Sequence, residues 1–241
     1  MNVKRQTLNF ASAIGIALVV VLWPAQMAMA NGGVIQEGAC KGILSCDNNT
    51  GLIKSGACAG PLSCYNNGKL IKEDACMGGE SCIGNNAIIA KGACSGGRAC
   101  SENRGIIKDW ACSGPASCVD NTGKIEKSSC AGSGSCVEND GKIHKDSCVG
   151  PESCMLNEGS IAEGSCMGKN SCNNNTGKIK HGSCNADGAC GNNTGVIASF
   201  SCNAFVESGA CKDNTQGDEK HHKKHKDKHK HKHKHKHKHA D

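Results

Sequence analysis

The sequence predicts an all-β protein, a narrow parallel β-solenoid (β-helix) of about ten 18-residue coils. Three observations support this fold class. Cysteine recurs every 18 residues in two series that are offset by six residues, and isoleucine, glycine and asparagine follow the same period. Only Tyr65, Trp110, Phe200 and Phe205 are aromatic after residue 30, which excludes a conventional aromatic core. A fixed period of this kind is typical of solenoids, in which each repeat packs mainly on its neighbours.

Residues 1–30 predict a secretory signal peptide. Lys4 and Arg5 precede an apolar run over residues 11–23, and small residues at 28–30 provide a cleavage site before Asn31. The run is shorter than the roughly 20 residues of a membrane-spanning helix, so an uncleaved anchor is the weaker alternative. We therefore expect a secreted protein, located in the periplasm or outside the cell.

Residues 31–211 contain the repeats, and residues 212–241 form a Lys/His-rich tail. Counted from its first cysteine, each repeat follows the pattern C-x-G-x-x-[SA]-C-x-x-N-x-G-x-I-x-x-x-[AS]. Isoleucine at position 14 predicts a strand whose side chain lies in the core, because β-branched residues favour strands. Alanine or serine at position 18 indicates a narrow interior. Two glycines per repeat would cost a helix about 1 kcal/mol each, so we expect short strands and corners stacked about 4.8 Å apart.

Glycine, proline and asparagine predict where each coil turns. Glycine at positions 3 and 12 fits corners that need positive φ or a close approach of two backbones. The three prolines after residue 30, Pro61, Pro115 and Pro151, all occupy position 4. Because proline cannot donate a ladder hydrogen bond, this position is expected to be a corner. Asparagine recurs at position 10, where we expect stacked amides to bond along the axis or to hold left-handed turns.

An even count of 20 cysteines in an exported chain predicts a framework of disulfides. Pairing across the Cys-x5-Cys corner closes a loop of about seven residues and contributes roughly 2 kcal/mol per bond. Pairing of position 7 with position 1 of the next repeat is an alternative that the spacing leaves open. No Cys-x-x-Cys pair occurs, so a zinc or iron–sulfur site is the weaker interpretation, and we expect no cofactor in the solenoid. The predicted disulfide cysteines are Cys40, Cys46, Cys58, Cys64, Cys76, Cys82, Cys94, Cys100, Cys112, Cys118, Cys130, Cys136, Cys148, Cys154, Cys166, Cys172, Cys184, Cys190, Cys202 and Cys211.

On this Cys-x5-Cys spacing, residues 31–211 resemble the disulfide-braced parallel β-solenoids, which include the insect antifreeze proteins. The resemblance covers architecture only. It would imply ice binding if the chain had a flat outward ladder of Thr-x-Thr. Position 11 carries Thr50, Thr122 and Thr176, but residues such as Gly68 and Asp140 interrupt the row. Ice binding is therefore a lesser candidate.

Position 13 changes character along the chain. Because isoleucine at position 14 is expected to point inward, position 13 should point outward. Its residues are Val34, Leu52, Leu70, Ile88 and Ile106, followed by Lys124, Lys142, Ser160 and Lys178. The five apolar residues form a candidate partner surface, for self-association or docking on another protein or an envelope surface, and a half-buried corner is the alternative. The first coil lacks an obvious cap, and its open β-edge predicts head-to-tail self-association.

The tail carries the strongest functional signal. Lysine and histidine alternate without a break over residues 230–239. A charged run with no apolar residues predicts disorder. Neutral imidazole is a ligand of Zn²⁺, Cu²⁺ and Ni²⁺, so we predict that the tail binds transition metal ions. The candidate ligands are His221, His222, His225, His229, His231, His233, His235, His237 and His239.

The lysines of the tail support a second function. The formal charge of the chain is +6, yet residues 31–217 have 16 basic against 18 acidic residues, so the tail carries the excess. A polycationic tail predicts adhesion to anionic lipid, polysaccharide or nucleic acid. A solubilising role is a third interpretation, and His144 and His181 are interpreted as surface residues. No acid, base or nucleophile recurs at a fixed outward position, so we predict no enzymatic activity.

Overall fold

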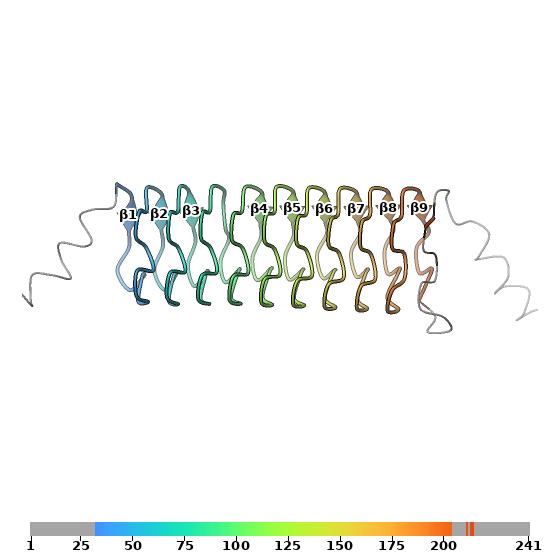
Figure 1. Ribbon diagram of the computed structural model, residues 1–241, viewed down its shortest axis with the longest axis horizontal. Helices are drawn as coiled ribbons and strands as arrows, with labels where there is room; N and C mark the ends of the chain where they lie inside the picture. The colour runs from blue at the N-terminus through green and yellow to red at the C-terminus, as the bar shows by residue number, and fades with distance from the viewer. Residues whose placement is uncertain (1–31, 204–210, 212, 215–241) are drawn as a thin grey trace, which may run out of the picture.

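The computed structural model, which describes residues 32–203, 211, 213 and 214, is a straight rod of stacked coils (Figure 1). Short strands run along one side of the rod. They are β1 (Val34–Ile35), β2 (Leu52–Ile53), β3 (Leu70–Ile71), β4 (Ile106–Ile107), β5 (Lys124–Ile125), β6 (Lys142–Ile143), β7 (Ser160–Ile161), β8 (Lys178–Ile179) and β9 (Val196–Ile197). In this described part, no helix has the length and apolar character needed to cross a membrane.

Within each sheet, consecutive strands pair in parallel at a register of 18 residues, as Val34 does with Leu52. The strands form two sheets in chain order, β1-β2-β3 and β4-β5-β6-β7-β8-β9. Between them, Ile89 forms single bridges to Ile71 and Ile107, and this coil carries no strand arrow in Figure 1. The predicted parallel β-solenoid with one coil per repeat is confirmed.

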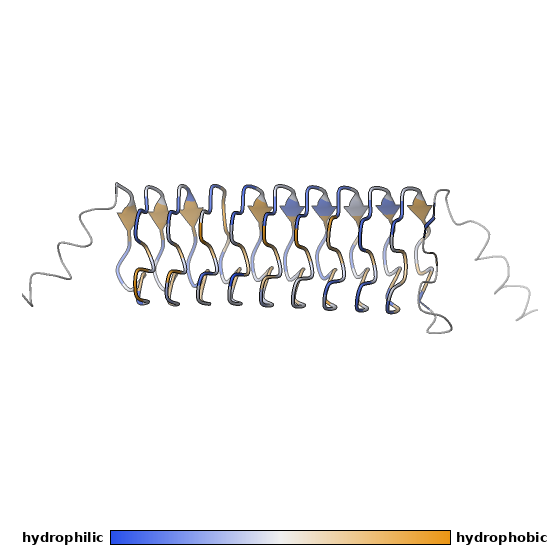
Figure 2. Cartoon of the chain, viewed as in Figure 1, coloured by the Kyte–Doolittle hydropathy of each residue, from blue (hydrophilic) through white to orange (hydrophobic). Residues whose placement is uncertain are grey.

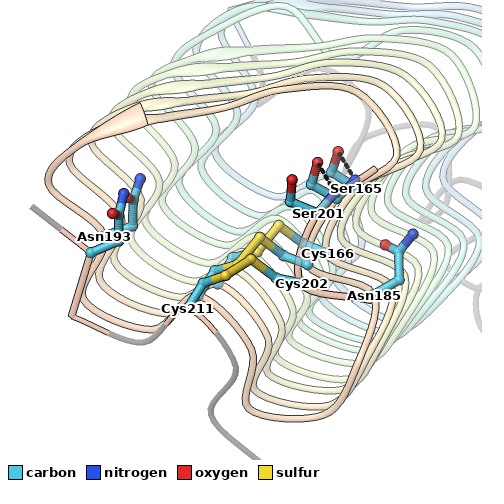
Figure 3. The surroundings of a disulfide bond; sticks show 12 residues. Ser165, Cys166, Asn185, Asn193, Ser201, Cys202 and Cys211 are labelled. Atoms are coloured by element: carbon cyan, nitrogen blue, oxygen red, sulfur yellow. Dashed lines mark hydrogen bonds between the residues drawn. A yellow bond between two sulfur atoms is a disulfide. The ribbon is translucent and has the colours of Figure 1, made fainter. Parts of the chain in front are cut away.

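The interior is built from the same positions in each coil. Isoleucine at position 14 is fully buried from Ile53 to Ile197, and the alanines and serines of position 18 are buried beside it. The disulfides lie inside the coil on the side away from the strand, and the asparagine of position 10, such as Asn193, also points inward (Figure 3). The core is therefore a set of identical residues repeated along the axis, as the repeat pattern predicts.

Ten disulfides brace the coils. Nine of them join positions 1 and 7 of one coil across six residues, from Cys40–Cys46 to Cys184–Cys190. The tenth, Cys202–Cys211, spans nine residues. The pairing within coils is the one observed, and the alternative pairing between repeats is wrong. So many disulfides indicate an oxidising environment outside the cell.

The buried asparagines form a continuous ladder. From Asn67 onward, each side-chain NH₂ donates to the side-chain oxygen of the asparagine in the previous coil, as Asn67 does to Asn49 at 2.8 Å and Asn139 does to Asn121 at 2.8 Å. The same NH₂ group donates to the carbonyl two residues later, which for Asn139 is that of Gly141 at 3.3 Å. The predicted ladder of amides along the axis is therefore confirmed.

At its two repeated positions, glycine is needed because the backbones of neighbouring coils approach closely, and not because φ is positive. A Cβ on Gly42, at position 3, would lie 2.1 Å from the oxygen of Gly60, and one on Gly123, at position 12, would lie 2.1 Å from that of Gly141. Positive φ occurs instead at the first cysteine of every coil, beginning with Cys40 at 59°. It also occurs at positions 5 and 9, where most residues are not glycine, and at position 17, where half are glycine. The corners are thus held in left-handed conformations by the coil as a whole.

Candidate functional site

The nine predicted histidine ligands and the rest of residues 215–241 lie outside the described residues. Among the described residues, the groups of three potential ligands that come within ligand distance are all cysteines, such as Cys118, Cys130 and Cys136, whose sulfurs lie within 4.8 Å of one another. Every cysteine is in a disulfide, so these sulfurs are not thiolates. The solenoid in its oxidised form therefore offers no thiolate metal site.

The two histidines of the described body have other neighbours. His144 Nδ1 lies 3.6 Å from a carboxylate oxygen of Glu126, with its side chain partly exposed. The ring of His181 packs edge-on against Phe200, with ring centroids 5.2 Å apart. These contacts agree with the interpretation of both histidines as surface residues.

The strands place one continuous surface on the outside of the rod. We define the strand face as the outward residues at positions 13 and 15 of each coil, which flank the buried isoleucine. Residues on a strand alternate between its two faces, so positions 13 and 15 share a face. The 3.0 Å contact between Lys124 Nζ and Glu126 Oε1, two residues apart, shows this directly. The strand face is therefore a surface on which the side chains of successive coils are aligned along the rod.

The first half of the strand face is apolar at position 13. Val34 is 63% exposed, Ile88 46% and Ile106 44%, while Leu52 and Leu70 are half-buried. The coils of β1, β2, β3 and β4 are apolar at the strands in Figure 2, and β5, β6 and β8 are hydrophilic there. The five predicted residues thus form an aligned and accessible apolar row, part of which is half-buried as the alternative interpretation held.

The strand face also carries a set of lysines that no sequence motif marks. Position 15 contributes lysines in the apolar half, and both positions contribute them in the other half. The seven are Lys54, Lys72, Lys108, Lys124, Lys142, Lys178 and Lys180. The signal for this set was available in the sequence, because position 15 lies on the same side of a strand as position 13.

Glu126 is the one acidic residue of the described strand face. The hydrogen bond from Lys124, and then the positive charges of Lys124, His144 and Lys142, hold the pKa of its carboxyl below its usual value, against an opposing desolvation effect. Glu126 is therefore ionised and paired at neutral pH, and it neutralises only part of the positive charge around it. The strand face is cationic.

No curated protein and no solved structure matches the chain significantly. A family model, described as a domain of unknown function (DUF7640), matches residues 25–114 and again residues 110–220. The two matches together span the solenoid, and each covers about half of it. The chain therefore belongs to the family of the domain of unknown function DUF7640.

Proposed function

We propose that the protein is an exported, non-catalytic rod that presents its C-terminal tail for the capture of transition metal ions. The observation that carries the proposal is the unbroken Lys-His alternation over residues 230–239. Neutral imidazoles at alternate residues supply several ligands of the type that Zn²⁺, Cu²⁺ and Ni²⁺ prefer. A structural rod braced by ten disulfides supports such a role, because it keeps its shape in an oxidising environment outside the cell.

The test is metal titration of the full chain beginning at Asn31, followed by calorimetry with Zn²⁺, Cu²⁺ and Ni²⁺ at neutral pH. In one variant, the nine tail histidines from His221 to His239 are replaced by glutamine. In a matched variant, the ten lysines over residues 220–238 are replaced by glutamine. We expect the histidine variant to lose metal binding and the lysine variant to keep it.

Acidification provides an independent check on the metal proposal. Imidazole has an unperturbed pKa of about 6.5, so binding should be lost at a pH of about 5, where the ligands are protonated. Metal binding that survives in the histidine variant, or that persists at the lower pH, would place the site elsewhere and overturn the proposal.

Adhesion to anionic surfaces is the second candidate function. It is supported by the ten lysines of the tail and by the cationic strand face of the solenoid. This function predicts the opposite pH response, since protonated histidines add positive charge, and it predicts weakening by salt. The lysine variant, and not the histidine variant, should lose the tail's share of the adhesion at neutral pH.

A further inference from the structure

The charge of the solenoid is segregated between its faces. The strand face has seven lysines and one acid, a formal net charge of +6. The remaining described residues have eight basic and 16 acidic residues, a formal net charge of −8. Although the net charge of the described residues is small, the strand face is strongly cationic and the rest of the solenoid is strongly acidic. Such an arrangement orients the rod toward an anionic partner.

The lysines of the strand face are largely free of acidic partners, whereas several basic residues elsewhere are paired. Lys91, Arg98 and Lys145 form ion pairs with Asp74, Glu80 and Glu163. Of the seven lysines on the described strand face, Lys124 is the one that forms an ion pair. Six ammonium groups on one side of the rod are thus available for an external anion.

The apolar row distinguishes between the possible anionic partners. Lys54 and Lys72 follow Leu52 and Leu70 by two residues on the same face, so apolar and cationic side chains lie in adjacent rows. A bilayer surface accepts both kinds of side chain, because apolar groups enter the boundary of the acyl chains while ammonium groups meet lipid phosphates. A hydrophilic anionic polymer offers no apolar surface that the apolar row could contact.

A second copy of the chain is a poorer occupant of this surface. Two strand faces in contact would place seven lysines against seven lysines, and like charges brought together at an interface are costly. A dimer in which the two strand faces meet is therefore disfavoured, and the charge of the strand face fits a negative partner. We propose that the strand face docks along the surface of an anionic lipid bilayer, with Leu70, Ile88 and Ile106 at the acyl boundary and the lysines on the headgroups.

Trp110 allows the test to report on the solenoid and not on the tail. In protein that begins at Asn31 it is the only tryptophan. Trp110 is two residues after Lys108 in the sequence. Its side chain covers Gly92 of the previous coil and is 53% exposed. Vesicles of phosphatidylcholine and phosphatidylglycerol that carry brominated acyl chains should quench its fluorescence. Vesicles of brominated phosphatidylcholine alone should not.

Matched variants of the full chain separate the strand face from general charge. Replacement of Lys54→Gln and Lys72→Gln should lower partitioning onto anionic vesicles by about tenfold to thirtyfold at low salt. Replacement of Lys41→Gln and Lys169→Gln, which lie off the strand face, changes net charge equally and should have little effect. Leu70→Gln with Ile88→Gln keeps the charge and should weaken partitioning severalfold while reducing the quenching of Trp110.

Three results would overturn the proposal. Vesicle binding that neither Lys54→Gln with Lys72→Gln nor Leu70→Gln with Ile88→Gln weakens would mean that the tail alone tethers the protein. Equal losses in the two lysine pairs would mean that the strand face has no special role. Unchanged vesicle binding in the Leu70→Gln, Ile88→Gln variant, with tighter binding to dextran sulfate than to vesicles, would identify an anionic polymer as the occupant. None of these outcomes depends on whether the tail histidines bind metal.

Discussion

Buried polar side chains in this rod follow two different arrangements. The asparagines of position 10 are satisfied on both sides of the amide, by their neighbours in the ladder and by the backbone two residues later. Among the described residues, seven serine hydroxyls of position 6, including those of Ser117 and Ser135, have no hydrogen-bond partner. The asparagine ladder was predictable from its recurrence at one position. The state of the serines was not, because position 6 is serine in seven described coils and alanine in two, and residue type alone does not show whether a hydroxyl has a partner.

Replacement of Ser117→Ala should stabilise the rod by about 1 kcal/mol, because it removes a buried hydroxyl that lacks a partner. Ala99 and Ala189 already occupy the same position in other coils, so the methyl group fits. The matched control is Ser147→Ala at position 18, whose hydroxyl donates to the carbonyl of Ala162 at 2.9 Å, and this change should destabilise. Denaturant unfolding of both variants measures the difference. A loss of stability in Ser117→Ala would show that its hydroxyl has a partner after all.

Glu126 provides a pH-dependent contribution at the residue scale. Its pKa is lowered in the folded rod, chiefly by the hydrogen bond from Lys124, so the ionised form favours the folded state. That contribution is fully present above the usual pKa of 4.5 and disappears as the pH falls through the lower folded value. Glu126→Gln should therefore cost up to about 1 kcal/mol at neutral pH and less at a pH well below 4.5. A difference that does not change with pH, measured by unfolding at both values, would contradict this assignment.

At the scale of the strand, one glycine decides whether neighbouring coils can pair fully. Position 12 is glycine in most coils, but it is Lys69 and Ala87 in two successive coils. A Cβ at position 12 meets the backbone oxygen of the next coil, at 2.1 Å when built on Gly105. Each of the two coils that carry a side chain at position 12 is followed by an interruption of the sheet, where Ile89 forms only single bridges. The break in the sheet could have been predicted from the sequence once the close approach at position 12 was recognised.

Gly123→Ala should reproduce that break between β5 and β6 and cost about 1–3 kcal/mol, because the new Cβ would lie 2.1 Å from the backbone oxygen of Gly141. Hydrogen exchange at Lys124 should accelerate, since its amide donates to that same oxygen at 2.9 Å. Gly97→Ala is the control, because its nearest neighbour would be 3.6 Å away. If both variants have the stability of the parent chain, the coils can separate at no cost and the explanation of the break is wrong.

For the whole molecule, the sequence was sufficient for the repeat, the parallel stacking and the inward isoleucine, because each of these recurs with the period. It was not sufficient for the conformation of the corners. Residues as different as Leu44, Glu102 and Trp110 have positive φ, so residue type alone did not mark these positions. Each such residue costs about 1 kcal/mol in its left-handed conformation. The disulfide that closes each coil, at roughly 2 kcal/mol, offsets part of this cost together with the packing of neighbouring coils, which gives the cysteines a larger role than filling the core.

The rod should therefore lose stability locally when one disulfide is removed. In a solenoid each coil interacts only with its neighbours, so the effect of a broken coil depends on its place in the stack. Replacement of Cys112→Ala and Cys118→Ala in the middle should cost roughly 2 kcal/mol and uncouple the two halves. Replacement of Cys40→Ala and Cys46→Ala at the end should loosen only the first coil.

Hydrogen exchange followed by mass spectrometry distinguishes these cases along the chain. In the central variant, protection should fall at Ile107 and Ile125, which flank the lost disulfide, and should remain high at Ile53 and Ile179. In the end variant, the amides near Ile53 should be the first to exchange faster. Because each coil packs only on its neighbours, the loss of one disulfide should not lower the hydrogen-exchange protection of amides in distant coils. A uniform loss of protection in the central variant would instead show that the ten coils unfold as one cooperative unit, with coupling that extends beyond adjacent repeats.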